Sequence, residues 1–145
     1  MPPVDRDQLV ARLTRRLEQS PEVLDAYLFG SFAREQAQAH SDVDVAVYVD
    51  RDHVLDTPPG YTAELTAALM AAVRSNAVDV VVLNNASPLL YHRVLRDGVR
   101  LLARDLHATT TREGRALSRY CDYLPQLRKV DTAHRARVEA GHVGR

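Results

Sequence analysis

A Gly-Ser pair and three acidic residues are the parts of this sequence whose types and spacing could do chemistry. Gly30 and Ser31 follow a short apolar run, Asp42 and Asp44 are separated by one valine, and Asp79 lies inside a later run of valines. Ten residues separate Ser31 from Asp42, enough for the chain to leave one strand and return along its neighbour. We therefore expect these residues to meet at one site.

The chemistry that such a site would support is metal-assisted phosphoryl transfer. Two aspartates two positions apart on a strand lie roughly 7 Å apart at the backbone and can converge on one divalent ion or on a pair of ions. Such oxygen ligands suit Mg²⁺, which completes its shell with water and substrate phosphates. A glycine lets the backbone approach phosphates closely, and Ser31 adds a hydroxyl and an amide donor. Asp79 is the candidate third carboxylate, as a metal-positioning group or as the base that accepts the proton of an attacking hydroxyl.

The strands that would position these residues are short and apolar. Residues 23–29 and 77–83 predict largely buried strands, and residues 99–103 predict a last one. Residues 41–50 alternate valine with Asp, Ala and Tyr, a period of two that predicts a strand with both carboxylates on one face. The fold class that follows is α+β with an α/β-like alternation, in which a small mixed sheet of about four strands is flanked by helices.

Helices are predicted between the strands. Residues 5–19 carry leucines at four-residue spacing, the pattern of an amphipathic helix. Residues 50–60 combine charges, prolines and a glycine, which predicts a loop, and the Ala- and Leu-rich residues 61–75 predict a helix.

The last third of the chain predicts two more helices. Ser87 and Pro88 form an N-cap followed by proline at the first helical position, and Gly98 ends that helix. From about Thr109 onward apolar residues fall at helical spacing, and Pro125 predicts a kink or a break in that helix.

Composition excludes several classes of protein. The 145 residues fit one domain, and 19 Lys plus Arg balance 19 Asp plus Glu, so there is no overall basic excess for direct nucleic-acid binding. No stretch has the apolar length of a membrane span, and the N-terminus does not read as a signal peptide. The single cysteine, Cys121, has no partner for an internal disulfide, and we expect it to be a small buried apolar residue. These features predict a cytoplasmic protein without a membrane partner.

The charges are unevenly distributed along the chain. Residues 1–50 hold nine acids and five bases, whereas residues 112–145 hold four acids and eight bases. The basic tail fits a solvated helix face, or contact with an acidic partner or with RNA, and its sequence does not distinguish these roles.

The segment GSFAREQAQAHSDVDVAV, followed later by VDVVVLN, resembles the active-site signature of the polymerase-beta-like nucleotidyltransferase superfamily. That signature is Gly-Ser, a ten-residue gap, Asp-x-Asp, and a third acid on a following strand. The small size and the segment ASPLLYHRVLRDGVRLLARD are similar to the minimal nucleotidyltransferases, the MNT-type antitoxins that pair with HEPN-domain ribonuclease toxins. The resemblance implies a nucleotidyltransferase domain over residues 1–124, and we expect a helical extension and tail over residues 125–145.

The resemblance implies a reaction and a set of roles. A hydroxyl attacks the α-phosphate of ATP and pyrophosphate leaves, with two Mg²⁺ ions as cofactor. In the antitoxins the acceptor is a tyrosine of the cognate HEPN toxin, whose RNA cleavage is silenced, so the implied partner is that toxin in a hetero-oligomer. The implied catalytic and metal-binding residues are Asp42, Asp44 and Asp79. The implied phosphate-binding residues are Gly30, Ser31 and Arg34.

Other interpretations remain open from the sequence. The same chemistry could act on a small hydroxyl compound, as in antibiotic-modifying relatives, or the protein could neutralise a partner by binding alone. An Asp-x-Asp pair on a strand can be a solvated face. Asp79 could be an edge-strand charge that discourages aggregation, and Arg34 could be a surface charge.

Overall fold

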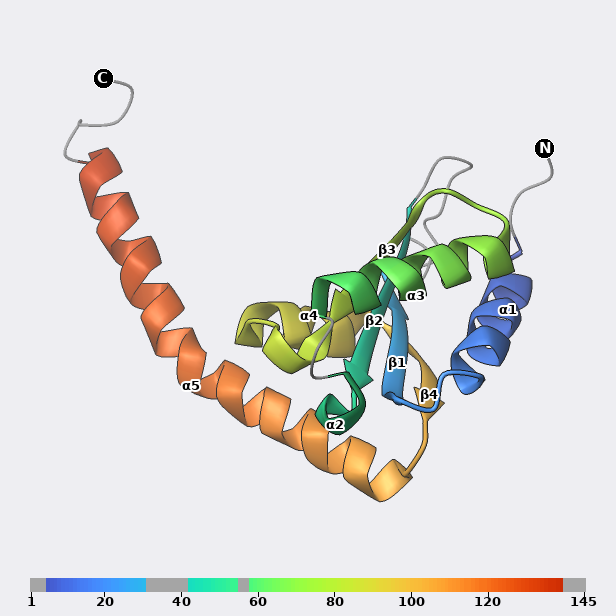
Figure 1. Ribbon diagram of the computed structural model, residues 1–145. Coiled ribbons are helices and arrows are strands. Elements are labelled where there is room, and N and C mark those ends of the chain that lie inside the picture. The colour runs from blue at the N-terminus through green and yellow to red at the C-terminus, as the bar shows by residue number, and fades with distance from the viewer. Residues whose placement is uncertain (1–4, 31–41, 55–57, 140–145) are drawn as a thin grey trace.

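Four strands form one mixed sheet, with helices on both of its faces (Figure 1). The computed structural model describes residues 5–30, 42–54 and 58–139. The strand order is β3-β2-β1-β4; β2 and β3 are parallel, and β1 is antiparallel to both β2 and β4. The strands are β1 (Val23–Phe29), β2 (Val43–Val49), β3 (Val78–Val82) and β4 (Val99–Ala103). This confirms the predicted fold class and the predicted strands.

The helices follow the predicted order with differences at two places. They are α1 (Arg6–Glu18), α2 (Arg51–Val54), α3 (Pro58–Val73), the short 3-10 helix η1 (Leu83–Asn85), α4 (Pro88–Asp97) and α5 (Leu106–Glu139). Among these described helices, none is long and apolar enough to cross a membrane.

The alternation in β2 separates two hydrophobic layers. Its valines, such as Val45 and Val47, pack with leucines of α1 and α3 on one face. Ala46 packs on the other face with buried residues of α4 and α5, among them Tyr91 and Ala116. Asp44 belongs to the second series by its position, so the helical layer of α4 and α5 is the one beside the candidate carboxylates.

Side-chain caps set the limits of the helices. The carboxylate of Asp5 accepts a hydrogen bond from the backbone N–H of Asp7 at 3.0 Å, and this begins α1. The hydroxyl of Ser87 accepts from the N–H of Leu90 at 3.2 Å, with proline next to it. The N–H of Gly98 donates to the carbonyl of Val94 at 2.8 Å. The predicted start and end of α4 are therefore confirmed, with the expected capping physics.

The loop predicted over residues 50–60 is wrong in part. α2 occupies Arg51–Val54, and α3 begins at Pro58, three residues before the predicted start. Asp50 explains the first helix, because its carboxylate accepts from the N–H of Asp52 at 3.1 Å, as an N-cap does. Prolines are compatible with the first turn of a helix, whose N–H groups have no intrahelical partner.

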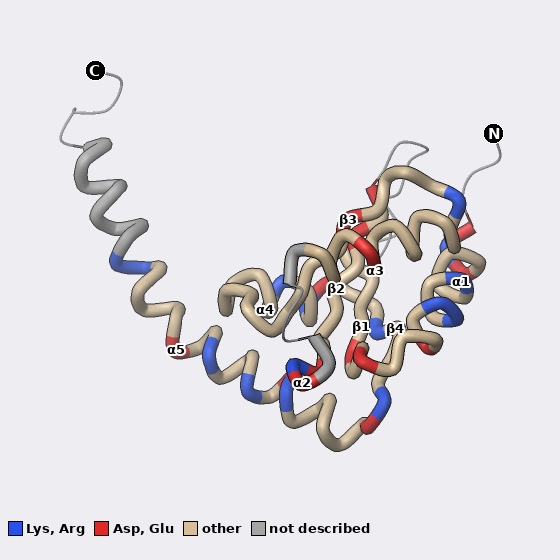
Figure 2. The backbone as a smooth tube through the Cα atoms, in the orientation of Figure 1, with Lys and Arg blue, Asp and Glu red and all other residues tan. Residues whose placement is uncertain are grey.

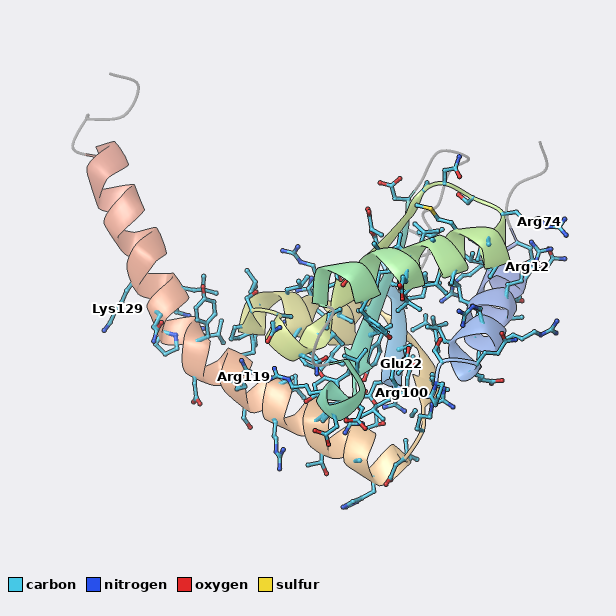
Figure 3. All side chains as sticks on the ribbon, viewed as in Figure 1. Arg12, Glu22, Arg74, Arg100, Arg119 and Lys129 are labelled. Carbon is cyan, nitrogen blue, oxygen red and sulfur yellow. The ribbon has the colours of Figure 1, made fainter. Side chains whose placement is uncertain are left out.

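α5 is continuous through Pro125, so the break that was one of the two alternatives predicted there is wrong. The helix passes through Pro125 to Glu139, since a long helix can curve around a single lost hydrogen bond. Figure 1 shows its second half leading away from the sheet, and Lys129 lies on that outer part (Figure 3). Cys121 is exposed, although the ring of the preceding residue, Tyr120, stacks on His92 of α4. The prediction of a buried cysteine is therefore wrong: helical spacing alone did not show which face of α5 is covered.

A buried ion pair fixes the first half of α5 to β1. Asp25 has no exposed surface, and the guanidinium of Arg112 donates to both of its oxygens at 2.7 and 2.8 Å. The hydroxyl of Thr109 donates to the same carboxylate at 2.5 Å. Arg112 also lies over the ring of Tyr48, 4.9 Å from its centre. The buried carboxylate of Asp25 is thus paired with a positive charge and hydrogen-bonded, as a buried charge requires.

Candidate active site

The end of β1 places a backbone turn directly against a carboxylate. Gly30 follows β1 with a φ of +79°, a conformation that only glycine adopts readily. A Cβ atom at this position would lie 2.3 Å from Oδ2 of Asp44. Glycine is required here by both the backbone angle and the space, and the close approach brings the Gly30 peptide beside the carboxylate.

Strand pairing centres the site on Asp44. This residue pairs with Phe29 in the antiparallel β1–β2 ladder and with Asp79 in the parallel β2–β3 ladder. Neighbouring strands are about 4.8 Å apart, so paired residues share a face and lie side by side. The structure therefore brings together Gly30, Asp44 and Asp79. Asp42 lies directly before β2, the strand that carries Asp44.

The three carboxylates interact electrostatically. Partial burial raises the pKa of Asp44 above its ordinary value, and the negative charges of Asp79 and then of Asp42 raise it further. Asp42 and Asp79 are themselves exposed. A cation bound here would relieve this like-charge repulsion, and Figure 2 shows acidic positions near the β3 label.

The donor chemistry fits Mg²⁺ shared with a nucleotide. Among residues 5–30, 42–54 and 58–139, no three His, Cys, Asp or Glu side chains lie grouped as a complete metal-binding set. Mg²⁺ is commonly held by one or two carboxylates, with water and substrate phosphates completing its shell. Asp44 and Asp79 lie opposite each other on neighbouring strands, and the charge of Asp79 raises the pKa of Asp44, so the two carboxylates satisfy that requirement.

Two of the predicted phosphate-binding residues cannot be placed. Ser31 and Arg34 lie outside the described residues, so their roles remain predictions. Asp79 lies on β3, a strand at the edge of the sheet. A charge that discourages aggregation would also lie at such an edge. Its register opposite Asp44 and its effect on the pKa of Asp44 connect it to the site.

A cavity at the other end of β2 and β3 was not predicted from the sequence. It has a volume of about 570 Å³, and its lining includes Val49, Val81, Asn84 and Leu90. The side-chain amide of Asn84 accepts from the Val49 N–H at 3.0 Å and donates to the Val49 carbonyl at 2.8 Å. Asn84 thereby continues the β2–β3 pairing beyond the end of β3. A strand followed by Asn-Asn was the only local hint of this turn.

The four-stranded mixed sheet, with its glycine turn against paired aspartates, is the arrangement that the resemblance to nucleotidyltransferases predicts. The family model described as "Polymerase beta, Nucleotidyltransferase" matches residues 11–107, more than half of the chain. The chain belongs to this family, which confirms the family and the enzyme class expected from the sequence.

Solved structures of toxin–antitoxin pairs have the same fold. An MNT antitoxin in complex with a tri-AMPylated HEPN toxin from Shewanella oneidensis superposes with a TM-score of 0.67 and 23% identity, over 90% of this chain and 99% of that one. A toxin–antitoxin structure with AMP-PNP gives 0.66 and 24%, over 90% and 99%. The pair MntA–HepT gives 0.66 and 24%, over 88% and 98%. No curated protein matches this chain.

Proposed function

We propose that this protein is a Mg²⁺-dependent antitoxin that transfers AMP from ATP to a tyrosine hydroxyl of a cognate HEPN toxin and thereby neutralises it. The observation that carries the proposal is the convergence of Gly30, Asp44 and Asp79 at one end of the sheet. Support for the acceptor and the nucleotide comes from the similar structures, one with an AMPylated HEPN toxin and one with AMP-PNP.

The proposed reaction is a substitution at the α-phosphorus of ATP. The tyrosine oxygen forms a bond to the α-phosphorus, the bond from that phosphorus to the bridging oxygen of the β-phosphate breaks, and pyrophosphate leaves. The hydroxyl proton is transferred to a carboxylate of the site. Asp79 is our candidate for that base, because it is exposed and lies opposite Asp44.

The remaining residues bind and orient the nucleotide. Asp42 and Asp44 would hold Mg²⁺, with Asp79 as the third carboxylate. When bound, Mg²⁺ would neutralise phosphate charge and favour the ionised form of the acceptor hydroxyl. The Gly30 peptide, together with Ser31 and Arg34, would contact the phosphates, since a glycine backbone with φ +79° leaves room for close approach.

The proposed setting is a hetero-oligomer with the toxin in the cytoplasm. ATP is available there, and the single exposed Cys121 would remain reduced. We assign no direct nucleic-acid binding to this chain, because its formal net charge is zero.

The test is intact mass spectrometry of the HEPN toxin after incubation with this protein, ATP and Mg²⁺. We expect the toxin to gain whole AMP units with the wild type and none with Asp42→Asn or Asp44→Asn. Asp52→Asn, at an exposed position on α2, is the matched control and should transfer AMP normally. Retained transfer in both site variants would refute the proposed site. A stable complex without transfer would instead support neutralisation by binding alone.

A further inference from the structure

The outer edge of β3 is open along the described chain. β3 lies at one end of the sheet and pairs only with β2 among the described residues. Its sequence is Val-Asp-Val-Val-Val, and Val80, Val81 and Val82 are half-buried. Edge strands are commonly protected by lysine, proline or a bulge, and β3 has only the charge of Asp79. An edge of this kind can accept an additional strand.

The register of the β2–β3 pairing places the outer edge of β3 beside the candidate catalytic carboxylates. A residue of an added strand paired with Asp79 would lie about 4.8 Å from it, with its side chain on the same face. That face carries Asp44 on the other side of Asp79. A hydroxyl side chain at the paired position would therefore be directed to the carboxylates.

The cavity described above is lined by the last two residues of the same strand, Val81 and Val82, together with residues of β2, α3 and α4. Val81 lies on the same face as Asp79, because side chains alternate along a strand, and it lines the cavity with Leu90 of α4. The volume of about 570 Å³ is within the range of ligand pockets. Edge binding of peptides gains affinity from the main chain and specificity from pockets for alternate side chains.

We propose that the acceptor segment of the partner binds as an extra strand on β3, with its hydroxyl residue opposite Asp79 and an apolar side chain two residues away in the cavity. This inference rests on the proposed function, because it identifies how that acceptor is recognised. The distance between alternate residues of the added strand, about 7 Å, equals the distance from Asp79 to Val81 along β3.

Backbone hydrogen exchange tests the edge. We would measure this protein alone and in complex with the HEPN toxin and a non-hydrolysable ATP analogue. The backbone N–H groups of Val78–Val82 that point away from β2, every second one along the strand, should exchange at least about tenfold more slowly in the complex, since edge pairing removes them from water. β4, the strand at the opposite edge, is the internal control and should be unchanged. A complex without added protection of β3 would overturn the inference.

A pair of neighbouring leucines tests the cavity. Leu90 lines it, whereas Leu89 does not and is 36% exposed. Leu90→Gln should raise the KM for the toxin about tenfold, a loss of about 1.4 kcal/mol in binding, and leave the KM for ATP unchanged. Leu89→Gln should change neither constant, and thermal unfolding would confirm that both variants fold. Equal KM values for the two variants would contradict the cavity assignment. Absence of AMP transfer by the wild type would refute the proposed function instead.

Discussion

Among single residues, Gly30 and Asp44 lie so close that a side chain at position 30 would displace the Asp44 carboxylate. We predict that Gly30→Ala lowers AMP transfer at least tenfold, because a Cβ 2.3 Å from Oδ2 of Asp44 must displace that carboxylate. The φ of +79° adds a backbone cost of about 1–2 kcal/mol. Gly114→Ala is the control: it has open space in α5 and should stabilise the protein by about 0.5–1 kcal/mol. Steady-state kinetics and urea unfolding measure both, and an active Gly30→Ala enzyme would contradict the site.

The raised pKa of Asp44 means that the ionised form of this carboxylate destabilises the folded protein. Its ordinary value is 3.8, and burial, Asp79 and Asp42 raise it in the folded protein. Between 3.8 and the raised value, the folded state binds more protons than the unfolded state. The free energy of unfolding that this group contributes therefore falls as pH increases through that window.

Two substitutions test this electrostatic coupling in the metal-free protein. Asp79→Asn should lower the pKa of Asp44 toward its ordinary value, which carbon NMR titration of the carboxyl groups would measure. Asp44→Asn should raise the Tm at neutral pH by roughly 1–2 °C while abolishing AMP transfer. Asp52→Asn should do neither. A lower Tm for Asp44→Asn would show that this aspartate stabilises the fold instead.

At the scale of elements, the contact between β1 and α5 depends on the pairing of Asp25. We predict that Arg112→Met destabilises the protein by about 3–5 kcal/mol, since it leaves the fully buried carboxylate without its positively charged partner. Adding Asp25→Leu should recover much of that loss. Arg96→Met is the control, because the Arg96 side chain is 60% exposed and pairs with the adjacent Asp97, and its unfolding curve should match the wild type. Urea denaturation distinguishes these outcomes.

At the scale of the whole molecule, the outer part of α5 contributes no residue to the described core. The last buried core residue is Ala116, whereas α5 continues to Glu139. We predict that deletion of residues 125–145 changes the Tm by less than about 3 °C. Differential scanning calorimetry measures this, and a larger loss would contradict the predicted boundary after residue 124.

The sequence by itself determined the strands and most of the helices, and it predicted which candidate residues lie together. Valine alternation specified which residues of β2 enter the core, because side-chain direction has a period of two. Ser87, Pro88 and Gly98 specified the limits of α4 through local capping. The motif also specified Gly30, Asp44 and Asp79 as partners, since its spacing and the family resemblance both depend on residue identity and not on distant contacts.

Only the tertiary structure decided the strand order and what it brings together. The parallel pairing that sets Asp79 opposite Asp44 and leaves the outer edge of β3 open joins residues 35 positions apart. The pairing of Asp25 with Arg112 spans 87 positions, and the exposure of Cys121 depends on which face of α5 packs on α4. Local propensity carries no information about such pairs, because their free energy exists only once separate elements have packed.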